Sequence, residues 1–225
     1  MNRRAPRLVL ITDRHATAGR PVPDVVAAAL RGLEGSRLSP ADVAVQLREK
    51  DLEGRALTDL ARTLRAITAA ADVALYVNDR VDVALAVGAD GVHLGGTSLP
   101  PAEVAKIAPA LAIAIAVSTH GAADVAAARA ACGDRLIFAL LGPIRDTPSK
   151  RAYGPPLGTG TFAEAVPLGV PLVAVGGLTP DDVPAVLDAG ARGLACIRAV
   201  MSAGDPAAVV RAFCKQFDTA STRPS

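Results

Sequence analysis

A segment that begins as a strand and ends as a cluster of charged side chains is the clearest chemical feature of this sequence. Residues 45–51 read Val-Gln-Leu-Arg-Glu-Lys-Asp. Side chains alternate faces along a strand, so Gln46, Arg48 and Lys50 should share one face while Val45 points to the other. Apolar groups outward and donors inward suit a barrel whose interior, at one end, receives a negatively charged substrate. The alternative is a strand that ends in solvated charges.

Two further groups at predicted strand ends extend this anion-binding pattern. Only four lysines occur, and two of them, Lys50 and Lys150, follow predicted strand ends. Asn78 and Asp79 follow another predicted strand, where they either cap the next helix or place one carboxylate on Mg²⁺. Magnesium usually takes one or two protein carboxylates together with substrate oxygens and water. With Arg48, these lysines would balance the charge of a diphosphate.

A glycine pair near the C-terminus indicates a phosphate site. Gly176 and Gly177 let the backbone approach a ligand closely, and Thr179 with Pro180 starts a helix as N-cap and first residue. Exposed N–H groups at such a position bind phosphate. The alternative is a tight turn that leads into a capped helix. Arg198, after the next predicted strand, could add charge to the same site.

The three histidines have different predicted roles. His93 ends an apolar strand, so we interpret it as a hydrogen-bonded structural residue rather than a base. His15 has no assigned role. His120 follows Ser118 at a predicted loop mouth, where a hydrogen-bonding or acid–base role fits. No cluster of histidines and cysteines has transition-metal spacing.

Short apolar runs that alternate with alanine-rich helical stretches position these groups. The predicted strands are Arg7–Thr12, Val43–Arg48, Ala74–Val77, Gly91–Leu94, Ala112–Val117, Leu136–Leu141, Pro171–Val175 and Gly193–Ile197. The predicted helices lie at about 24–31, 57–70, 79–87, 101–108, 121–132, 161–166, 180–189 and 206–217. Eight such pairs predict a closed (β/α)8 TIM barrel of the α/β class. Residues 1–217 would form this single domain, and 218–225 a disordered tail.

Composition sets the limits of function. A chain of 225 residues with 51% hydrophobic residues can bury one large core. Its net charge of +2 and the absence of a basic stripe argue against nucleic acid or a membrane surface as a partner. The three cysteines are scattered, which is typical of a reducing cytoplasm. A homo-oligomer stays open.

These blocks resemble the thiamine phosphate synthase and thiazole tautomerase family, and the match runs from Leu8 to about Val200. The residues that carry it are Ile11-Thr12-Asp13, Gln46 to Asp51, Asn78 to Asp82, Gly91 to Gly95, Val117 to His120, Gly142-Pro143, Lys150 and Val175-Gly176-Gly177.

The resemblance implies a barrel enzyme that couples hydroxymethylpyrimidine diphosphate to a thiazole phosphate with Mg²⁺. The implied pyrimidine diphosphate ligands are Gln46, Arg48, Lys50, Asn78 and Lys150, with Ser118 beside the pyrimidine. Of these, Arg48, Lys50, Lys150 and Ser118 would be catalytic. Asp79 would bind the metal. The implied thiazole ligands are Thr147 and Ser149, with Gly176, Gly177, Ile197 and Arg198 at its phosphate.

Four positions depart from the family pattern. Ser98 stands where a second metal-binding aspartate is usual, Arg145 with Asp146 replaces an aromatic residue and a proline, and Arg198 replaces a small serine. A working synthase is still the leading hypothesis, because the diphosphate set of Arg48, Lys50, Asn78, Asp79 and Lys150 is intact. The alternatives are a thiazole tautomerase-like isomerase with His120 as proton carrier, and a non-catalytic barrel that binds thiamine phosphate.

Overall fold

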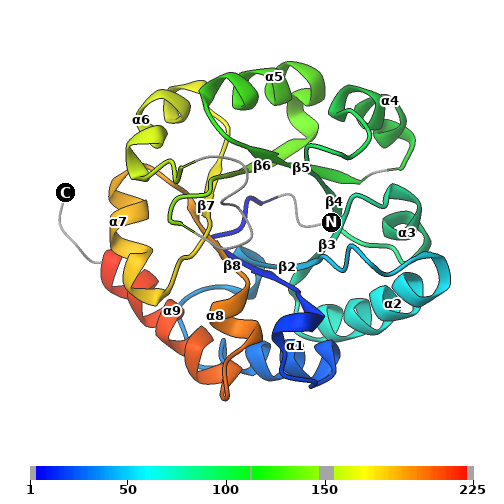
Figure 1. The fold of residues 1–225 in the computed structure, drawn as a ribbon, viewed down its shortest axis with the longest axis vertical. Helices are drawn as coiled ribbons and strands as arrows, with labels where there is room; N and C mark the ends of the chain where they lie inside the picture. Colours follow the sequence, from blue (N-terminus) through cyan, green and yellow to red (C-terminus); the bar gives the residue numbers. More distant parts are fainter. Residues whose placement is uncertain (1–3, 112, 147–154, 222–225) are drawn as a thin grey trace.

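The chain forms a closed barrel of parallel strands. The computed structural model describes residues 4–111, 113–146 and 155–221. Each strand pairs in parallel with the next along the chain, and β8 pairs with β1 to close the ring, as Figure 1 shows end-on. The strands are β1 (Leu8–Ile11), β2 (Val43–Leu47), β3 (Ala74–Asn78), β4 (Gly91–Leu94), β5 (Ala114–Thr119), β6 (Leu136–Leu141), β7 (Leu172–Val175) and β8 (Gly193–Cys196). The predicted (β/α)8 architecture is confirmed.

Helices form an outer ring around the strands (Figure 1). They are α1 (Val22–Arg31), α2 (Gly54–Ala70), α3 (Val81–Ala86), α4 (Pro101–Leu111), α5 (Ala122–Cys132), α6 (Phe162–Ala165), α7 (Val183–Asp188), α8 (Arg198–Met201) and α9 (Pro206–Ser221). In the described part of the chain, none of them is long and apolar enough to cross a membrane. The short α8 was not predicted, and it begins at Arg198 directly after β8.

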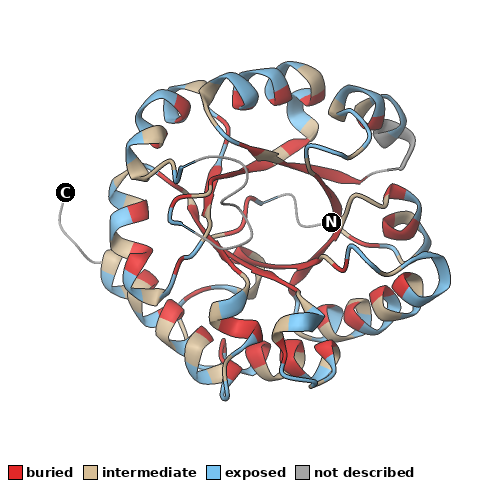
Figure 2. Cartoon of the chain, viewed as in Figure 1, coloured by how far each residue is buried: buried red, intermediate tan, exposed pale blue. Residues whose placement is uncertain are grey.

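Two hydrophobic clusters follow from the alternation of side chains along the strands. One lies between the strands and helices and includes Val45, Leu75 and Val92. The other fills the barrel interior and includes Ile11 and Phe138. Figure 2 shows the strands almost entirely buried, while each helix turns one buried face to the barrel and an exposed face to solvent. The strands are therefore buried on both faces, as parallel sheets require.

Aromatic side chains from β3 and β6 pack against each other in the barrel interior. The rings of Tyr76 and Phe138 meet edge to face with centroids 5.2 Å apart. Gly91 makes room for this pair, because a Cβ atom there would lie 2.2 Å from the ring of Tyr76. Polar groups of the interior therefore collect above this layer, toward the carboxyl ends of the strands.

Most element boundaries agree with the prediction to within a few residues, and the differences have physical causes. Asn78 lies inside β3 and Ser118 inside β5, not in the following loops. Both polar side chains face the barrel interior, where hydrogen bonds replace water, so a polar residue does not end these strands.

The expected tail was partly wrong. Helix α9 continues through Ser221, four residues beyond its predicted end at 217. Phe217 is fully buried, and Arg7 lies over its ring at 4.8 Å, so the helix is held against the barrel up to this point. Residues 222–225 lie outside the described chain.

Candidate active site

Side chains from four neighbouring strands form a hydrogen-bonded row inside the carboxyl end of the barrel. Gln46 on β2 donates from Nε2 to Oδ1 of Asn78 on β3 at 3.1 Å, and it lies 2.9 Å from Nδ1 of His93 on β4. Nε2 of His93 lies 3.4 Å from Oγ of Ser118 on β5. The structure thus brings together three of the predicted pyrimidine ligands, with His93 in the middle of the row.

His93 is buried, and its environment keeps it neutral. Burial, reinforced by the positive charge of Arg48, lowers its pKa to about 3. A neutral imidazole carries a proton on one nitrogen and accepts at the other. The prediction that His93 is hydrogen-bonded rather than a base agrees with this environment.

The cationic segment after β2 lies beside this row. Thr12, at the end of β1, accepts a hydrogen bond from the backbone N–H of Arg48 at 2.9 Å, which holds the start of the loop. Arg48 is half-buried, whereas Lys50 is exposed in the following turn. In the described chain neither cation makes an ion pair with a carboxylate, so both charges remain available to an anion.

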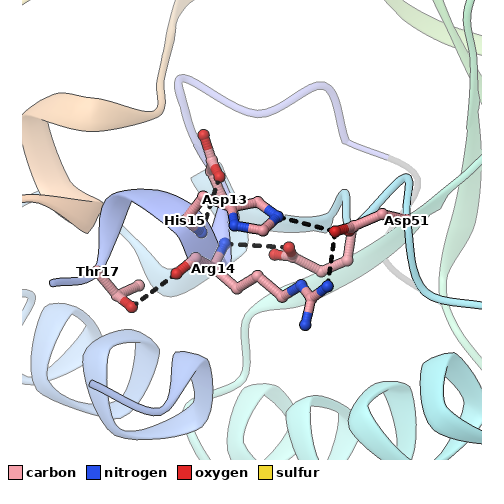
Figure 3. A network of polar contacts seen from close by, with 6 residues as sticks. Asp13, Arg14, His15, Thr17 and Asp51 are labelled. Atoms are coloured by element: carbon pink, nitrogen blue, oxygen red, sulfur yellow. Dashed lines mark hydrogen bonds and ion pairs between the residues drawn. The ribbon is translucent and has the colours of Figure 1, made fainter. Parts of the chain in front are cut away.

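The β1 and β2 loops are tied to each other at the rim. Arg14 donates from its guanidinium to Asp51 at 2.6 Å and from its backbone N–H to Glu49 at 3.0 Å. His15 lies 2.8 Å from the same Asp51 oxygen, and Figure 3 shows both side chains converging on that carboxylate. These contacts hold the pKa of Asp51 well below its usual range. His15, which had no predicted role, therefore helps to hold the loop that carries Lys50.

Asp79 shows backbone strain where the metal ligand was predicted. Its φ of 68° is a left-handed conformation that side chains other than glycine rarely adopt, and its N–H donates to the carbonyl of His93 at 2.8 Å. Such strain concentrates at functional sites. A single half-buried carboxylate suits Mg²⁺ that draws its other ligands from substrate oxygens and water.

The structure does not support Ser98 as a second metal ligand. Its Oγ accepts a hydrogen bond from the N–H of Gly95 at 2.8 Å, so the hydroxyl closes the β4 loop on itself. Among residues 4–111, 113–146 and 155–221, no group of three or more His, Cys, Asp or Glu side chains could hold a metal. Asp79 is therefore the candidate metal ligand that remains among the described residues of these loops, and its role stays a prediction.

His120, directly after β5, links the loops that follow β5 and β6. Its Nδ1 lies 2.6 Å from the carbonyl oxygen of Gly142, and its backbone N–H donates to Asp124 at 2.8 Å. A carbonyl only accepts, so Nδ1 carries the proton and Nε2 is the nitrogen left to accept one. His120 is exposed, and this geometry leaves a proton-carrying role open without assigning one.

The predicted phosphate loop has the expected backbone. Gly176 and Gly177 have φ values of 112° and 68°, both in the region that favours glycine. Thr179 is the N-cap of the 3-10 helix η7 (Pro180–Asp182), and its N–H donates to the buried Asp182 carboxylate at 2.8 Å. The predicted start with Thr179 and Pro180 is confirmed. A turn with positive φ at both positions is one that glycine adopts readily, and the backbone N–H groups of a turn can bind an anion.

Two arginines that depart from the family pattern lie around this loop. Arg145 pairs with Asp182 through its guanidinium and donates from its backbone N–H to Gly176 at 3.1 Å. The β6 loop is thereby attached to the phosphate loop. Arg198 begins α8 after Ile197 and is exposed.

The sequence indicated most residues of the site, but not the hydrogen bonds and ion pairs that join them. His93 could have been assigned to the interior from alternation within β4, because Val92 and Leu94 face outward, but its partners depend on strand register. The ion pair of Arg145 joins residues 37 positions apart and leaves no local signal. Thr147, Ser149 and Lys150 lie outside the described residues.

The comparisons with known proteins identify the family. A family model described as thiamine monophosphate synthase matches residues 8–200. The chain belongs to the thiamine monophosphate synthase family. It is 42% identical to the thiamine-phosphate synthase of Roseiflexus castenholzii, over 91% of this chain and 85% of that protein. It is 40% identical to the thiamine-phosphate synthase of Methanoculleus marisnigri, over 91% and 92%.

Solved structures agree with this membership. Thiamine phosphate pyrophosphorylase from Pyrococcus furiosus superposes with a TM-score of 0.82 and 30% identity, and the match covers 97% of this chain and 98% of that one. A 3-hexulose-6-phosphate synthase structure has a TM-score of 0.63 at 20% identity, which shows a shared fold alone. The matched segment of the thiamine monophosphate synthase family includes every site residue considered above.

Proposed function

We propose that this chain condenses hydroxymethylpyrimidine diphosphate with a thiazole phosphate to give thiamine phosphate and diphosphate. It acts as a transferase in thiamine biosynthesis. The observation that carries the proposal is the meeting of Gln46, Asn78 and Ser118 in one row inside the barrel, with the uncompensated charge of Arg48 beside it. A row of polar side chains beside a cationic loop suits an uncharged ring that carries a diphosphate.

The pyrimidine diphosphate occupies the β2 to β5 side of the mouth in this proposal. Gln46, Asn78 and Ser118 contact the ring, while Arg48 and Lys50 bind the diphosphate, with Lys150 as a third cation. A guanidinium binds phosphate oxygens in a two-pronged geometry, and an ammonium acts as a point charge. Half-buried Arg48 would form the stronger contact, because its charge is less screened than that of exposed Lys50.

Asp79 holds Mg²⁺ in this proposal. When bound, the metal supplies positive charge to the diphosphate oxygens. The left-handed backbone at Asp79 is held by its N–H bond to His93, which fixes where the carboxylate starts. With Ser98 engaged within its own loop, we infer that water and diphosphate oxygens complete the coordination.

The thiazole phosphate occupies the β6 to β8 side. Its phosphate would bind the N–H groups of the Gly176–Gly177 turn and of Ile197–Arg198, and phosphate sites often form after strands 7 and 8 of this fold. The guanidinium of Arg198 would contact the same phosphate. Thr147 and Ser149 would contact the thiazole.

The reaction needs charge stabilisation more than proton transfer. The bond between the pyrimidine methylene carbon and the diphosphate oxygen breaks, and diphosphate leaves with the electron pair. The thiazole nitrogen then donates its lone pair to that carbon and forms the new C–N bond. Arg48, Lys50 and Lys150 stabilise the leaving charge, and the two half-sites hold the nitrogen in line with the carbon. A site rich in cations, in which the one buried histidine stays neutral, suits this chemistry.

A thiazole tautomerase-like activity is the second candidate, and the observation that favours it is the pair formed by Ser98 and His120. Ser98 supplies no carboxylate, and His120 presents Nε2 as an acceptor at the mouth. Asp79 argues against it, because isomerisation of a thiazole phosphate needs no diphosphate metal. A non-catalytic barrel would bind thiamine phosphate without turnover.

The three cysteines are free and buried, which is consistent with an enzyme of the cytoplasm.

One paired assay separates these candidates. The purified protein is given both substrates with Mg²⁺, and thiamine phosphate formation is measured beside isomer interconversion of the thiazole phosphate. We expect product from the natural chain and a loss of about 100-fold or more in Asp79→Asn, because the metal charge is lost. Asn tolerates the left-handed backbone, so the variant should fold.

The matched control is Asp82→Asn, which removes an exposed carboxylate three residues away that pairs with Arg80 at 2.5 Å. It should retain activity within about twofold. Isomer interconversion without condensation would favour the tautomerase. Tight binding of thiamine phosphate without either reaction would favour the binding barrel.

A further inference from the structure

The row inside the barrel contains a histidine that the proposed chemistry does not use. His93 is 3% exposed and lies between Gln46 and Ser118, both of which we place at the pyrimidine. In the described chain its imidazole makes no contact with a carboxylate. Its Nδ1 instead lies 2.9 Å from the amide of Gln46 and 3.4 Å from that of Asn78, and its Nε2 lies 3.4 Å from Ser118, so its effect on a ligand must pass through these neighbours.

Hydrogen-bond chemistry fixes the tautomer of this histidine. The two contacts of Gln46 Nε2 use both protons of an amide nitrogen, one for Asn78 Oδ1 at 3.1 Å and one for His93 Nδ1 at 2.9 Å. An amide nitrogen donates and does not accept, so with Gln46 in this orientation Nδ1 of His93 is the accepting nitrogen, and its approach to Asn78 Oδ1 at 3.4 Å brings two acceptors together rather than forming a hydrogen bond. The ring proton is then on Nε2, which faces Ser118 Oγ at 3.4 Å.

This tautomer and the orientation of the two amides support one another. With Nδ1 unprotonated, an oxygen of Gln46 turned toward His93 would face an unprotonated nitrogen and a carbonyl oxygen, with no donor for it. With the observed orientation, the carbonyl Oε1 of Gln46 and the Nδ2 group of Asn78 are the amide groups without a partner among the described residues. One is an acceptor and the other a donor, on adjacent strands β2 and β3.

We propose that His93 is a positioning residue that orients Gln46 and Asn78 so that they present an acceptor beside a donor to an aminopyrimidine. Such a ring has an exocyclic amino group that donates beside a ring nitrogen that accepts, which complements this pair. The inference rests on the proposed function and deepens it, because it names what distinguishes the pyrimidine from other rings. The neutral state of His93 supports it, since a second ring proton would leave Gln46 facing another donor.

Two substitutions separate the role of Nδ1 from that of mere packing. His93→Leu keeps the volume but removes the acceptor, and His93→Asn can place an amide oxygen near the position of Nδ1. The control is Phe138→Leu, which loosens the interior layer through its ring contact with Tyr76 and touches no polar group of the row. All three chains are compared with the natural chain by KM for each substrate and by calorimetric binding of hydroxymethylpyrimidine without its diphosphate.

For His93→Leu we expect KM for the pyrimidine diphosphate and Kd for the free pyrimidine to rise about tenfold, because the amides lose their fixed orientation. KM for the thiazole phosphate should stay within about twofold, since its proposed site lies on the other side of the mouth. His93→Asn should recover most of the loss, and Phe138→Leu should lower thermal stability without this selectivity. Equal effects on both substrates, or no recovery by His93→Asn, would overturn the inference.

A measurement on the natural chain keeps the inference testable if the variants do not fold. Two-bond ¹⁵N–¹H spectra of histidine-labelled protein report which ring nitrogen carries the proton, and we expect the Nε2–H form for His93. The Nδ1–H form would overturn the inference. An inactive natural chain with the Nε2–H form and tight pyrimidine binding would reject the proposed condensation while supporting the positioning role.

Discussion

The two ends of the barrel use charge in opposite ways. At the amino end of the strands, the buried carboxylate of Asp42 accepts from Arg4 and Arg192, each at 2.9 Å. At the carboxyl end, Arg48 and Lys50 make no ion pair within the described residues. Charged side chains at the amino end are thus paired within the protein, whereas those at the carboxyl end remain available to a ligand.

Local geometry follows the same division. Asp42 joins three parts of the chain, because its carbonyl also accepts from the N–H of Arg7 at 2.6 Å, next to β1. Asp79, at the other end, keeps a left-handed backbone and a carboxylate that makes no hydrogen bond or ion pair within the described chain. In barrels of this type the amino end stabilises and the carboxyl end carries activity. Substitutions at the two ends should therefore affect different measurements.

The largest expected effect on stability is at the amino end. Asp42→Ala leaves Arg192 partly buried without its partner, so the free energy of unfolding should fall by about 3 kcal/mol, at the low end for a broken buried pair because both arginines reach solvent. Chemical denaturation measures this change, and kcat/KM at low temperature should stay within about twofold.

The control for that prediction is Asp59→Ala on α2. Its ion pair with Arg62 is 61% exposed on both sides, so its removal should cost less than about 0.5 kcal/mol. A loss of kcat/KM in Asp42→Ala without a loss of stability would contradict the division between the two ends.

A smaller effect is expected from the buried histidine of the mouth, and it depends on pH. His93 has a folded pKa of about 3 against an ordinary value of 6.5, so between these values the unfolded chain binds a proton that the folded chain does not. Its contribution to stability is therefore present above about pH 6.5 and is lost as pH falls, by about 1 kcal/mol for each pH unit.

Subtraction isolates this effect from other titrating groups. The free energy of unfolding is measured from about pH 7 to pH 4.5 for the natural chain and for His93→Asn, and the difference between the two should change with that slope. Parallel curves would mean that His93 takes up its proton equally readily in the folded and the unfolded chain, which would contradict its neutral, buried state.

Most of the fold could be predicted from the sequence because each strand is an apolar run and each helix has one apolar face. The errors lie where a tertiary contact overrides local pattern. Asn78 and Ser118 stay in strands because each makes a polar contact within the row around His93. Helix α9 extends beyond 217 into a segment whose composition alone indicates a tail.

The residues of the candidate site could be predicted from the sequence, but the hydrogen bonds between them could not. Alternation placed Gln46 inward, and its burial in the barrel interior agrees with this. The bonds from Gln46 to His93 and from Arg14 to Glu49 join residues 47 and 35 positions apart, so they depend on strand register and loop shape. A single sequence shows neither the register of the strands nor the shape of the loops. The functional roles of the site residues stay predictions until the variants are measured.

The smallest expected effect is at the rim, and it tests whether the cations of the mouth are truly left for the ligand. Arg14→Ala removes the guanidinium from Asp51 but keeps the backbone N–H bond to Glu49, so the loop should stay in place. The carboxylate of Asp51 then lies without that partner next to Lys50 in the chain and competes for its ammonium. KM for the pyrimidine diphosphate should rise about threefold at low salt and by much less at about 0.5 M salt, because exposed charges are screened. Arg62→Ala on α2 is the control and should change neither value. A loss that does not depend on salt would mean that Arg14 binds the substrate itself, and the rim would then belong with the ligand site rather than with its support.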